Sequence, residues 1–384
     1  MKKIIFLSTF ALDANLSIIK ELSLKYDVYF ITEALHKKYN YLDPSKLDAL
    51  VSNGTEVTEL QPFSEMVDLS KVFVIHGIRQ RHIIRKLYNS YIINRLVQKI
   101  NPDVIMTDTF TMTYIFSQIK YRSHTLLIVH DPFLHSGEYS VSVVLMRKFL
   151  FKIIPYKLLF NDAQRKDFCK YYKQKEINVF SSFLSTYEYL TYFKPNNIEK
   201  KDDSFEILFF GRISPYKGIK YLLDAVVLLI KKGYKNIHVT IAGSGTFDFD
   251  IHPYFKYKQV SFINRYIEPN ELAGFITNSS IVVCPYTDAT QSGVIMSAFA
   301  FGKPVIATNV GGLPDMVKNN HTGIIVPAKN PMQLSDAIER LINNPSTLET
   351  MHNNILGDYH DGGVMGWRKA VDHITNAINY ILSR

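Results

Sequence analysis

The chain has 384 residues, and its 44 Lys and Arg outnumber its 35 Asp and Glu, giving a formal net charge of +9. A hydrophobic content of 47%, with 18 Gly and 15 Pro, fits an ordinary globular protein and excludes a disordered chain. The length favours two domains over a single core, and the positive charge favours acidic partners such as nucleotides, anionic lipid or nucleic acid.

Cysteine usage and hydropathy bear on the compartment. Cys169 and Cys284 lie far apart in the sequence and form no metal-ligand or redox pattern, so we expect reduced thiols in a cytoplasmic protein. The opening "MKKIIFLSTFALDANLS" becomes polar too early for a signal peptide. No uninterrupted run reaches the roughly 20 apolar residues of a membrane-spanning helix.

The first half of the chain alternates apolar strands with helical segments. "KKIIFLS" is short and continuously apolar, which predicts a buried strand, and a helical stretch follows to Lys25. The pattern returns at "YDVYFIT", "PDVIMTD", "HTLLIVHD" and "YKLLFND". This alternation predicts a parallel sheet covered on both faces, in a first domain over residues 1–190.

A second alternating series follows a polar linker around residues 185 to 205. Its expected strands are "FEILFFG", "NIHVTIAG", "QVSFIN", "SIVVCPY", "PVIAT" and "TGIIVP". "GIKYLLDAVVLLIKKG" has the basic residues and Gly of a helix end. We therefore expect an α/β protein of two tandem, doubly wound Rossmann-like domains facing a central cleft, the second over 204–357, with ligands beyond the carboxyl ends of the strands.

Three segments of the second domain could bind an anion. "GRISPYKG" places Gly211, Arg212 and Lys217 after a strand, and two such cations suit a diphosphate. "IAGSG" would let a ligand approach the backbone at Gly243, Ser244 and Gly245. Ser292 and Gly293 begin a predicted helix whose free N–H groups attract phosphate. The alternatives are solvated cations, a plain turn and a buried helix without a ligand.

The first domain offers one polar loop and two basic segments. "HDPFLHSGE" places His130 and Asp131 at a strand end, followed by His135, Ser136 and Glu138, and His130 could contact a sugar hydroxyl or move a proton. A structural histidine is the alternative. Residues 79–95 and 144–157 interleave cations with large apolar side chains, as in helices lying on an anionic membrane surface. A solvated helix face explains them equally well.

Together these segments resemble the retaining glycosyltransferases of family 4, which have the GT-B fold. The resemblance rests on "GRISPYKGIKYLL", "IAGSG", "VSFINRYIEPNEL", "QSGVIMSAFAFGKPVIATNVGGLPDMV" and "TGIIVP", whose order and spacing extend through most of the second domain. In the first domain it rests on "VHDPFLHSGE" alone. "GWRKAVDHITNAINYIL", within residues 358–384, resembles the family's last helix, which crosses back to the first domain.

The resemblance implies a UDP- or GDP-linked sugar bound by the second domain and a glycan or lipid-linked acceptor bound by the first. It implies no metal and no cofactor beyond the donor. Arg212 and Lys217 fall on the diphosphate-binding pair, and His130 falls near the sugar-facing histidine, beside Asp131, His135 and Glu138. The remaining implied donor contacts are Gly211, Gly243, Ser244, Gly245, Arg265, Tyr266, Asp288, Gln291, Ser292, Gly293, Val294 and Ser297.

One departure concerns the two glutamates that many members carry. Ser297 occupies the second position, and Ala289 or Thr290 occupies the first, so that Asp288 is the nearest carboxylate. A Ser hydroxyl can partly replace a carboxylate that holds ribose hydroxyls. The resemblance implies transfer by front-face substitution, which requires no protein nucleophile, so we expect an active enzyme. We also expect a role in bacterial surface polysaccharide synthesis, with the protein peripheral on the inner face of the membrane.

Two alternatives remain open at this point. A nucleotide-sugar epimerase shares the two-domain architecture, and a degenerate transferase could serve as a nucleotide-binding scaffold. Nucleic-acid binding is not expected, because the basic residues are dispersed and no nucleic-acid-binding module is present.

Overall fold

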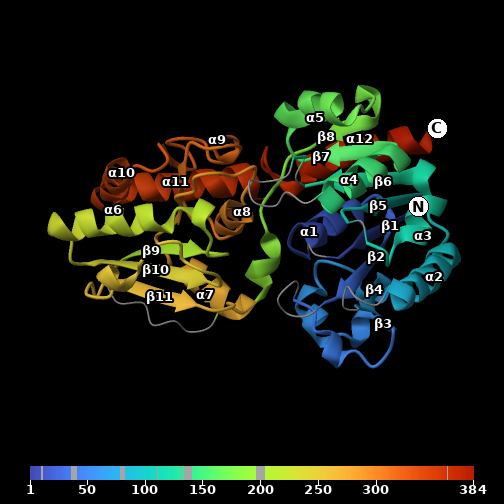
Figure 1. Ribbon diagram of the computed structural model, residues 1–384, viewed down its shortest axis with the longest axis horizontal. Helices are drawn as coiled ribbons and strands as arrows, with labels where there is room; N and C mark the ends of the chain where they lie inside the picture. The colour runs from blue at the N-terminus through green and yellow to red at the C-terminus, as the bar shows by residue number, and fades with distance from the viewer. Residues whose placement is uncertain are drawn as a thin grey trace. The chain divides into compact units, whose positions relative to one another are not determined.

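The chain folds into two compact units, shown in Figure 1. Unit 1 comprises Met1–Ser185 and Trp367–Arg384, and unit 2 comprises Thr186–Gly366. The computed structural model describes residues 1–9, 12–35, 41–77, 83–109, 111–130, 132–133, 141–195, 204–360 and 362–384. The last helix therefore belongs to unit 1, although it follows unit 2 in the sequence.

Unit 1 is built on an eight-stranded sheet of order β3-β4-β2-β1-β5-β6-β7-β8. The strands expected from the sequence are confirmed as β1 (Lys3–Ser8), β2 (Asp27–Ala34), β5 (Val104–Thr107), β6 (Thr125–Val129) and β7 (Tyr156–Leu159). Three strands were not expected: β3 (Val51–Asn53), β4 (Val72–His76) and β8 (Val179–Ser181). The pairs are parallel except β3 with β4, which is antiparallel.

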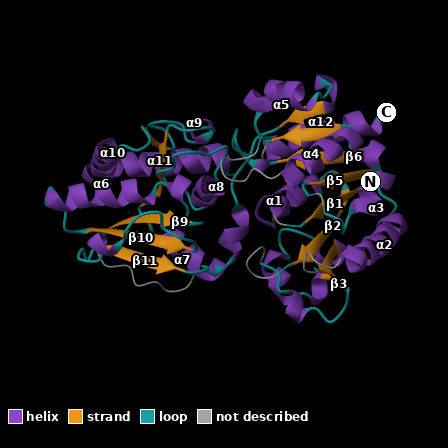
Figure 2. Cartoon of the chain, in the orientation of Figure 1, coloured by secondary structure: helices purple, strands orange, loops and turns teal. Residues whose placement is uncertain are grey.

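The described helices of unit 1 are α1 (Leu12–Leu22), α2 (Ile83–Ile100), α3 (Ile115–Lys120), α4 (Val141–Ile153), α5 (Arg165–Tyr172) and α12 (Trp367–Leu382) (Figure 2). α12 buries Trp367, Val371, Ile374 and Ile378. Ser182 Oγ donates a hydrogen bond of 2.9 Å to the Ala370 carbonyl, and Lys25 Nζ lies 2.8 Å from an Asp372 carboxylate oxygen. The packing of α12 is thus part of the core of unit 1.

Unit 2 is built on a six-stranded parallel sheet of order β11-β10-β9-β12-β13-β14. All six strands expected in this half are confirmed: β9 (Phe205–Phe210), β10 (Ile237–Gly243), β11 (Val260–Asn264), β12 (Ile281–Cys284), β13 (Val305–Thr308) and β14 (Gly323–Val326). The helices are α6 (Ile219–Lys231), α7 (Pro269–Asn278), α8 (Gly293–Ala300), α9 (Leu313–Met316), α10 (Pro331–Asn343) and α11 (Pro345–Tyr359).

The strand order of unit 2 reverses between β9 and β12, because β10 and β11 lie on one side of that pair and β13 and β14 on the other. In open parallel sheets the crevice at such a reversal, beyond the carboxyl ends of the strands, is where ligands bind. The loops after β9 and β12 are the segments in which the sequence placed Arg212, Lys217 and Ser292.

Candidate functional site

The loops after β9 and β10 touch through their backbones at Gly243. The Gly211 N–H donates to the Ala242 carbonyl at 3.0 Å, and Ile213 N–H donates to the Ser244 carbonyl at 3.0 Å. A Cβ added to Gly243, whose φ is +156°, would lie 1.8 Å from the Gly211 carbonyl oxygen. Packing between the two loops therefore requires a glycine here, whether or not a ligand approaches the segment.

Lys217 is a buried cation of the site, and its pKa is lowered. It ends the short 3₁₀ turn Pro215–Lys217, is 9% exposed, and holds its Nζ 3.7 Å from the centroid of the Tyr286 ring. Burial lowers the pKa of Lys217 to about 8; the Cys284 thiol opposes this shift and the Arg212 charge adds to it. Arg212 itself is exposed. An anion placed beside these two cations would offset their mutual repulsion.

Helix α8 begins beside this cation pair. Ser292 occupies its N-cap position, as expected. Within the described residues its side chain makes no capping bond, and its hydroxyl lies 3.2 Å from the Tyr286 hydroxyl. The first N–H groups of an α-helix have no partner within the helix, so this end of α8 is suited to phosphate oxygens.

The Tyr187 ring lies against Gly293 at the start of α8, a contact that no sequence pattern indicated. A Cβ on Gly293 would lie 2.6 Å from Tyr187 Cε2, and the Tyr187 N–H donates to the Met296 carbonyl at 3.2 Å. Gly293 therefore allows an aromatic ring to lie directly against the helix start. Tyr187 precedes β9, far from α8 in the sequence. It could be predicted as a neighbour of α8 only from the path of the folded chain.

The loop after β12 is tied to both of its neighbours. Thr287 N–H donates to the Tyr216 carbonyl at 2.7 Å, and Thr308 Oγ1 donates to the Tyr286 carbonyl at 2.6 Å. Asp288 is exposed, whereas Gln291 and Val294 are half-buried. These bonds position Tyr286, and the Lys217 ammonium that lies over its ring, at the carboxyl end of β12.

Ser297 lies on α8, where the sequence placed it, but it is buried. A side chain with so little exposure leaves a ribose little access to its hydroxyl. Its assignment as a donor contact stays a prediction, and so does a donor role for the exposed Asp288.

The end of β11 holds the residues expected near a nucleotide base. Arg265 Nη1 donates to a Glu271 carboxylate oxygen at 2.7 Å, and the Tyr266 ring is partly exposed. Asn264, which the sequence did not single out, bonds both backbone groups of Gly245, accepting at 3.2 Å and donating at 3.1 Å. Asn264 thereby links the loop after β10, which contains Ser244, to the loop after β11. In the sequence, Asn264 could be recognised as a candidate only from its position at the end of a predicted strand.

In unit 1, His130 follows β6 as expected. Its Nε2 lies 3.7 Å from Asp108 Oδ2, and its ring centroid is 5.4 Å from that of Phe160. Asp131, His135 and Glu138 lie outside the described residues. Asp108 was not among the expected site residues, although it ends the quoted segment "PDVIMTD".

Two further observations concern metals and membranes. Over the described ranges, no group of three or more His, Cys, Asp and Glu side chains is arranged to hold a metal ion. Neither is any helix there both long and apolar enough to traverse a bilayer.

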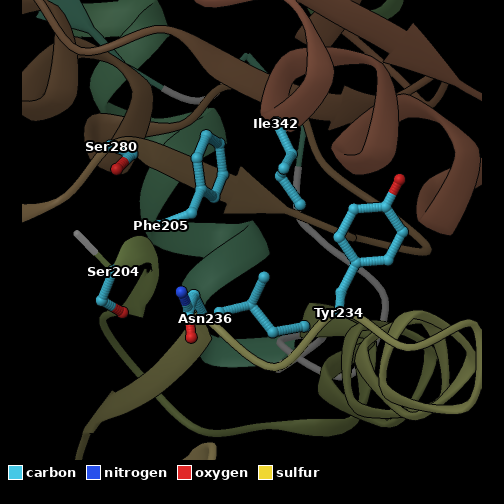
Figure 3. Close-up of a pocket in the computed structure, with 7 residues that line it drawn as sticks. Ser204, Phe205, Tyr234, Asn236, Ser280 and Ile342 are labelled. Carbon is cyan, nitrogen blue, oxygen red and sulfur yellow. The ribbon is translucent and has the colours of Figure 1, made fainter.

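A pocket of about 350 Å³ lies at the amino ends of β9 and β10 (Figure 3). It is therefore separate from the carboxyl ends of these strands, where the candidate site lies. Its lining includes Phe205, Tyr234, Asn236 and Ile342.

Known proteins whose sequences are similar to part of this chain are named as glycosyltransferases. Residues 192–356 match the family model described as "Glycosyl transferases group 1". The chain is 34% identical over 157 residues to a D-inositol 3-phosphate glycosyltransferase of Paenarthrobacter aurescens, covering 39% of this chain and 38% of that protein. It is 31% identical over 166 residues to the capsular polysaccharide biosynthesis glycosyltransferase CapM of Staphylococcus aureus, covering 41% and 43%. The matches thus span less than half of these relatives.

The fold is shared over the whole chain. The structure of Anabaena Alr3699/HepE in complex with UDP superposes with a TM-score of 0.66 at 16% identity and covers 100% of both chains. The expected GT-B fold, with two Rossmann-like units, is therefore confirmed.

Proposed function

We propose that this protein is a retaining glycosyltransferase that moves a sugar from a nucleoside diphosphate donor to a hydroxyl of a glycan or lipid-linked acceptor. The observation that carries the proposal is the buried Lys217, held with Arg212 beside the start of α8 at the point where the strand order reverses. The match of residues 192–356 to a glycosyltransferase family model supports it. The CapM relative supports a role in surface polysaccharide synthesis.

The chemistry requires stabilisation of a leaving diphosphate more than it requires a protein nucleophile. As the sugar–oxygen bond breaks, negative charge develops on the diphosphate, and Arg212, Lys217 and the α8 N-terminus are the groups that meet it. The acceptor hydroxyl attacks from the same face and gives its proton to a departing phosphate oxygen. The reaction then retains configuration, and the protein supplies positioning and charge.

Helices α2 and α4 support a membrane-bound acceptor. α2 contains Arg85, Lys86, Arg95 and Lys99 and no carboxylate, and it exposes Ile84, Tyr88 and Tyr91 along one stripe. α4 also lacks carboxylates, and it exposes Leu145 and Phe149 one turn apart. Apolar side chains flanked by cations suit an anionic lipid surface, so we infer that the protein works at a membrane.

Calorimetric titration with UDP and GDP tests the donor site. Lys217→Met removes the charge and keeps the length of the side chain, and we expect it to weaken binding of the preferred nucleotide about tenfold or more, as for the loss of a hydrogen bond to a charged group. Lys220→Met is the matched control, because Lys220 is exposed and paired with Asp224 at 2.6 Å. Equal affinity in Lys217→Met and wild type would refute the proposed donor site.

A donor incubated alone separates transfer from other chemistry. Slow release of sugar to water, accelerated by an added acceptor, is the expected result. Conversion of the donor to an epimer would instead identify an epimerase, and nucleotide binding without any turnover across a broad panel of donors and acceptors would identify a scaffold.

A further inference from the structure

Two tyrosine rings lie against the ammonium group of Lys217. Its Nζ is 3.7 Å from the centroid of the Tyr286 ring and 5.0 Å from that of the Tyr216 ring. The two rings meet edge to face, with centroids 6.3 Å apart and an interplanar angle of 78°. The face of an aromatic ring carries partial negative charge, and it attracts a cation that lies within about 6 Å of its centroid. Both rings therefore stabilise the Lys217 ammonium.

The titratable groups around Lys217 do not supply this stabilisation. The groups that act on its charge are the Arg212 guanidinium and the Cys284 thiol. Arg212 repels the ammonium, and burial raises the pKa of the Cys284 thiol to about 11, so the thiol is uncharged at neutral pH. The tyrosine rings, in place of an anion, thus offset the loss of water around a lysine that is 9% exposed.

Tyr286 also contacts the start of α8. Its side chain is fully buried, and burial raises the pKa of its hydroxyl well above the ordinary value, so the phenol stays neutral. That hydroxyl lies 3.2 Å from Ser292 Oγ. Tyr286 therefore contacts Lys217 with its ring and the N-cap residue of α8 with its hydroxyl.

The contact between Tyr286 and Ser292 engages a hydroxyl that could otherwise cap α8. A serine at the N-cap usually accepts a hydrogen bond from a backbone N–H of the first turn. Within the described residues the Ser292 side chain makes no such bond. Because the first N–H groups of a helix have no partner inside it, engaging Ser292 with Tyr286 leaves these groups available to phosphate oxygens.

We propose that Tyr286 is a positioning residue of the donor site, whose ring holds the Lys217 ammonium and whose hydroxyl holds Ser292, so that the ammonium and the α8 N-terminus bind one diphosphate together. The inference rests on the proposed function, in which this diphosphate belongs to the nucleotide sugar. A nucleoside monophosphate offers a single phosphate group to these two elements. The arrangement therefore selects a diphosphate over a monophosphate.

Two substitutions separate the ring of Tyr286 from its hydroxyl. Tyr286→Phe keeps the ring, whereas Tyr286→Leu removes both groups. Calorimetric titration of the full chain with UDP and UMP, and with GDP and GMP, measures the effects. We expect Tyr286→Leu to weaken diphosphate binding about tenfold, as for loss of a desolvated cation–π contact, and to reduce the preference for diphosphate over monophosphate. Tyr286→Phe should weaken diphosphate binding only about threefold to fivefold, as for loss of one hydrogen bond.

A double-mutant cycle with Lys217→Met tests whether the ring acts through the lysine. Lys217→Met should weaken diphosphate binding about tenfold or more in wild type and in Tyr286→Phe, but about threefold or less in Tyr286→Leu, where no ring holds the ammonium. Tyr254→Leu is the matched control, because Tyr254 is a buried tyrosine of unit 2 that donates to Asp224 at 2.6 Å. Its loss should lower the melting temperature and leave nucleotide affinity unchanged.

The positioning role is overturned if Lys217→Met weakens binding equally in Tyr286→Leu and in wild type, or if Tyr254→Leu weakens binding as much as Tyr286→Leu does. If Tyr286→Leu does not fold, Tyr286→Phe combined with Ser292→Ala replaces it. The second substitution should then add little to the first, and additive losses of affinity would overturn the proposal. The proposed function is refuted separately, by equal nucleotide affinity of Lys217→Met and wild type.

Discussion

Burial makes the charge of Lys217 sensitive to pH, which bears on its proposed role at the diphosphate. Its ammonium lies over the Tyr286 ring at 3.7 Å, and with little water to solvate the charge its pKa falls to about 8. A bound diphosphate would favour the charged form. Binding and proton uptake are therefore linked at this residue, whereas Arg212 stays charged throughout the same range.

We expect nucleotide affinity to fall as the pH rises through about 8. Well below this value Lys217 is protonated before and after binding, so it adds no pH dependence; above it the free protein must take up a proton to bind, and affinity falls by up to about tenfold per pH unit. Titrations at about pH 7 and above avoid the ionisation of the nucleotide's terminal phosphate near pH 6.

Lys217→Arg is the control for this pH dependence, because a guanidinium keeps its charge over the whole range. The variant should bind UDP with an affinity that no longer declines above pH 8 relative to its own value at pH 7. A decline of equal steepness in Lys217→Arg and wild type would assign the titration to another group.

At the scale of elements, the contact between the loops after β9 and β10 makes a stability prediction. A methyl group at Gly243 would meet the Gly211 carbonyl oxygen at 1.8 Å, so one of the two loops must move. We expect Gly243→Ala to lower the free energy of unfolding of unit 2 by about 3 kcal/mol, at the upper end for backbone strain. Urea unfolding followed by circular dichroism measures it.

Gly357 provides the opposite case within the same unit. It lies in α11, and nothing comes within 4 Å of a Cβ added there. Gly357→Ala should therefore stabilise unit 2 by about 0.5–1 kcal/mol, because alanine loses less backbone entropy in a helix. Equal effects of the two substitutions would contradict the role assigned to Gly243.

The exposed stripe of α2 predicts binding to anionic vesicles. Ile84 is 87% exposed, and Ile84→Ser with Tyr88→Ser removes apolar surface that would enter the lipid, which should weaken binding about tenfold or more. Sedimentation with phosphatidylglycerol vesicles measures this, with phosphatidylcholine vesicles for comparison. Ile177→Ser, at an exposed position of the 3₁₀ turn Glu176–Asn178, should bind as wild type does. Absence of wild-type binding to phosphatidylglycerol would refute the membrane inference.

The elements that the sequence predicted are those whose own residues determine their structure. Strands such as β1 and β9 each contain four consecutive apolar residues, all buried. β3 and β8 have three residues each and lie at the two edges of their sheet, so their pairing depends on neighbours that are distant in the sequence. β4 (Val72–His76) has an apolar run of four residues, as long as that of β1, so the pattern did indicate a strand here and the prediction missed it.

The same distinction applies to the site residues. Arg212 and Lys217 occur within one short motif, so the sequence could indicate them together. Asp108 and His130 become neighbours only because β5 pairs with β6, and Tyr187 reaches α8 only because the segment before β9 folds back. These relations depend on strand order, which hydrophobic periodicity does not determine.

At the scale of the molecule, α12 joins the end of the chain to the unit that contains its beginning. Ile374 is fully buried in unit 1. Ile374→Ala should destabilise unit 1 by about 2–5 kcal/mol through lost packing, while Asn376→Ala, exposed on the same helix, should have little effect. A ligand stabilises the unit that binds it, so if unit 2 binds UDP as proposed, calorimetry with and without UDP distinguishes the two units. We expect Ile374→Ala to lower the transition that UDP leaves unchanged; lowering only the UDP-sensitive transition would show that α12 supports the donor-binding unit instead.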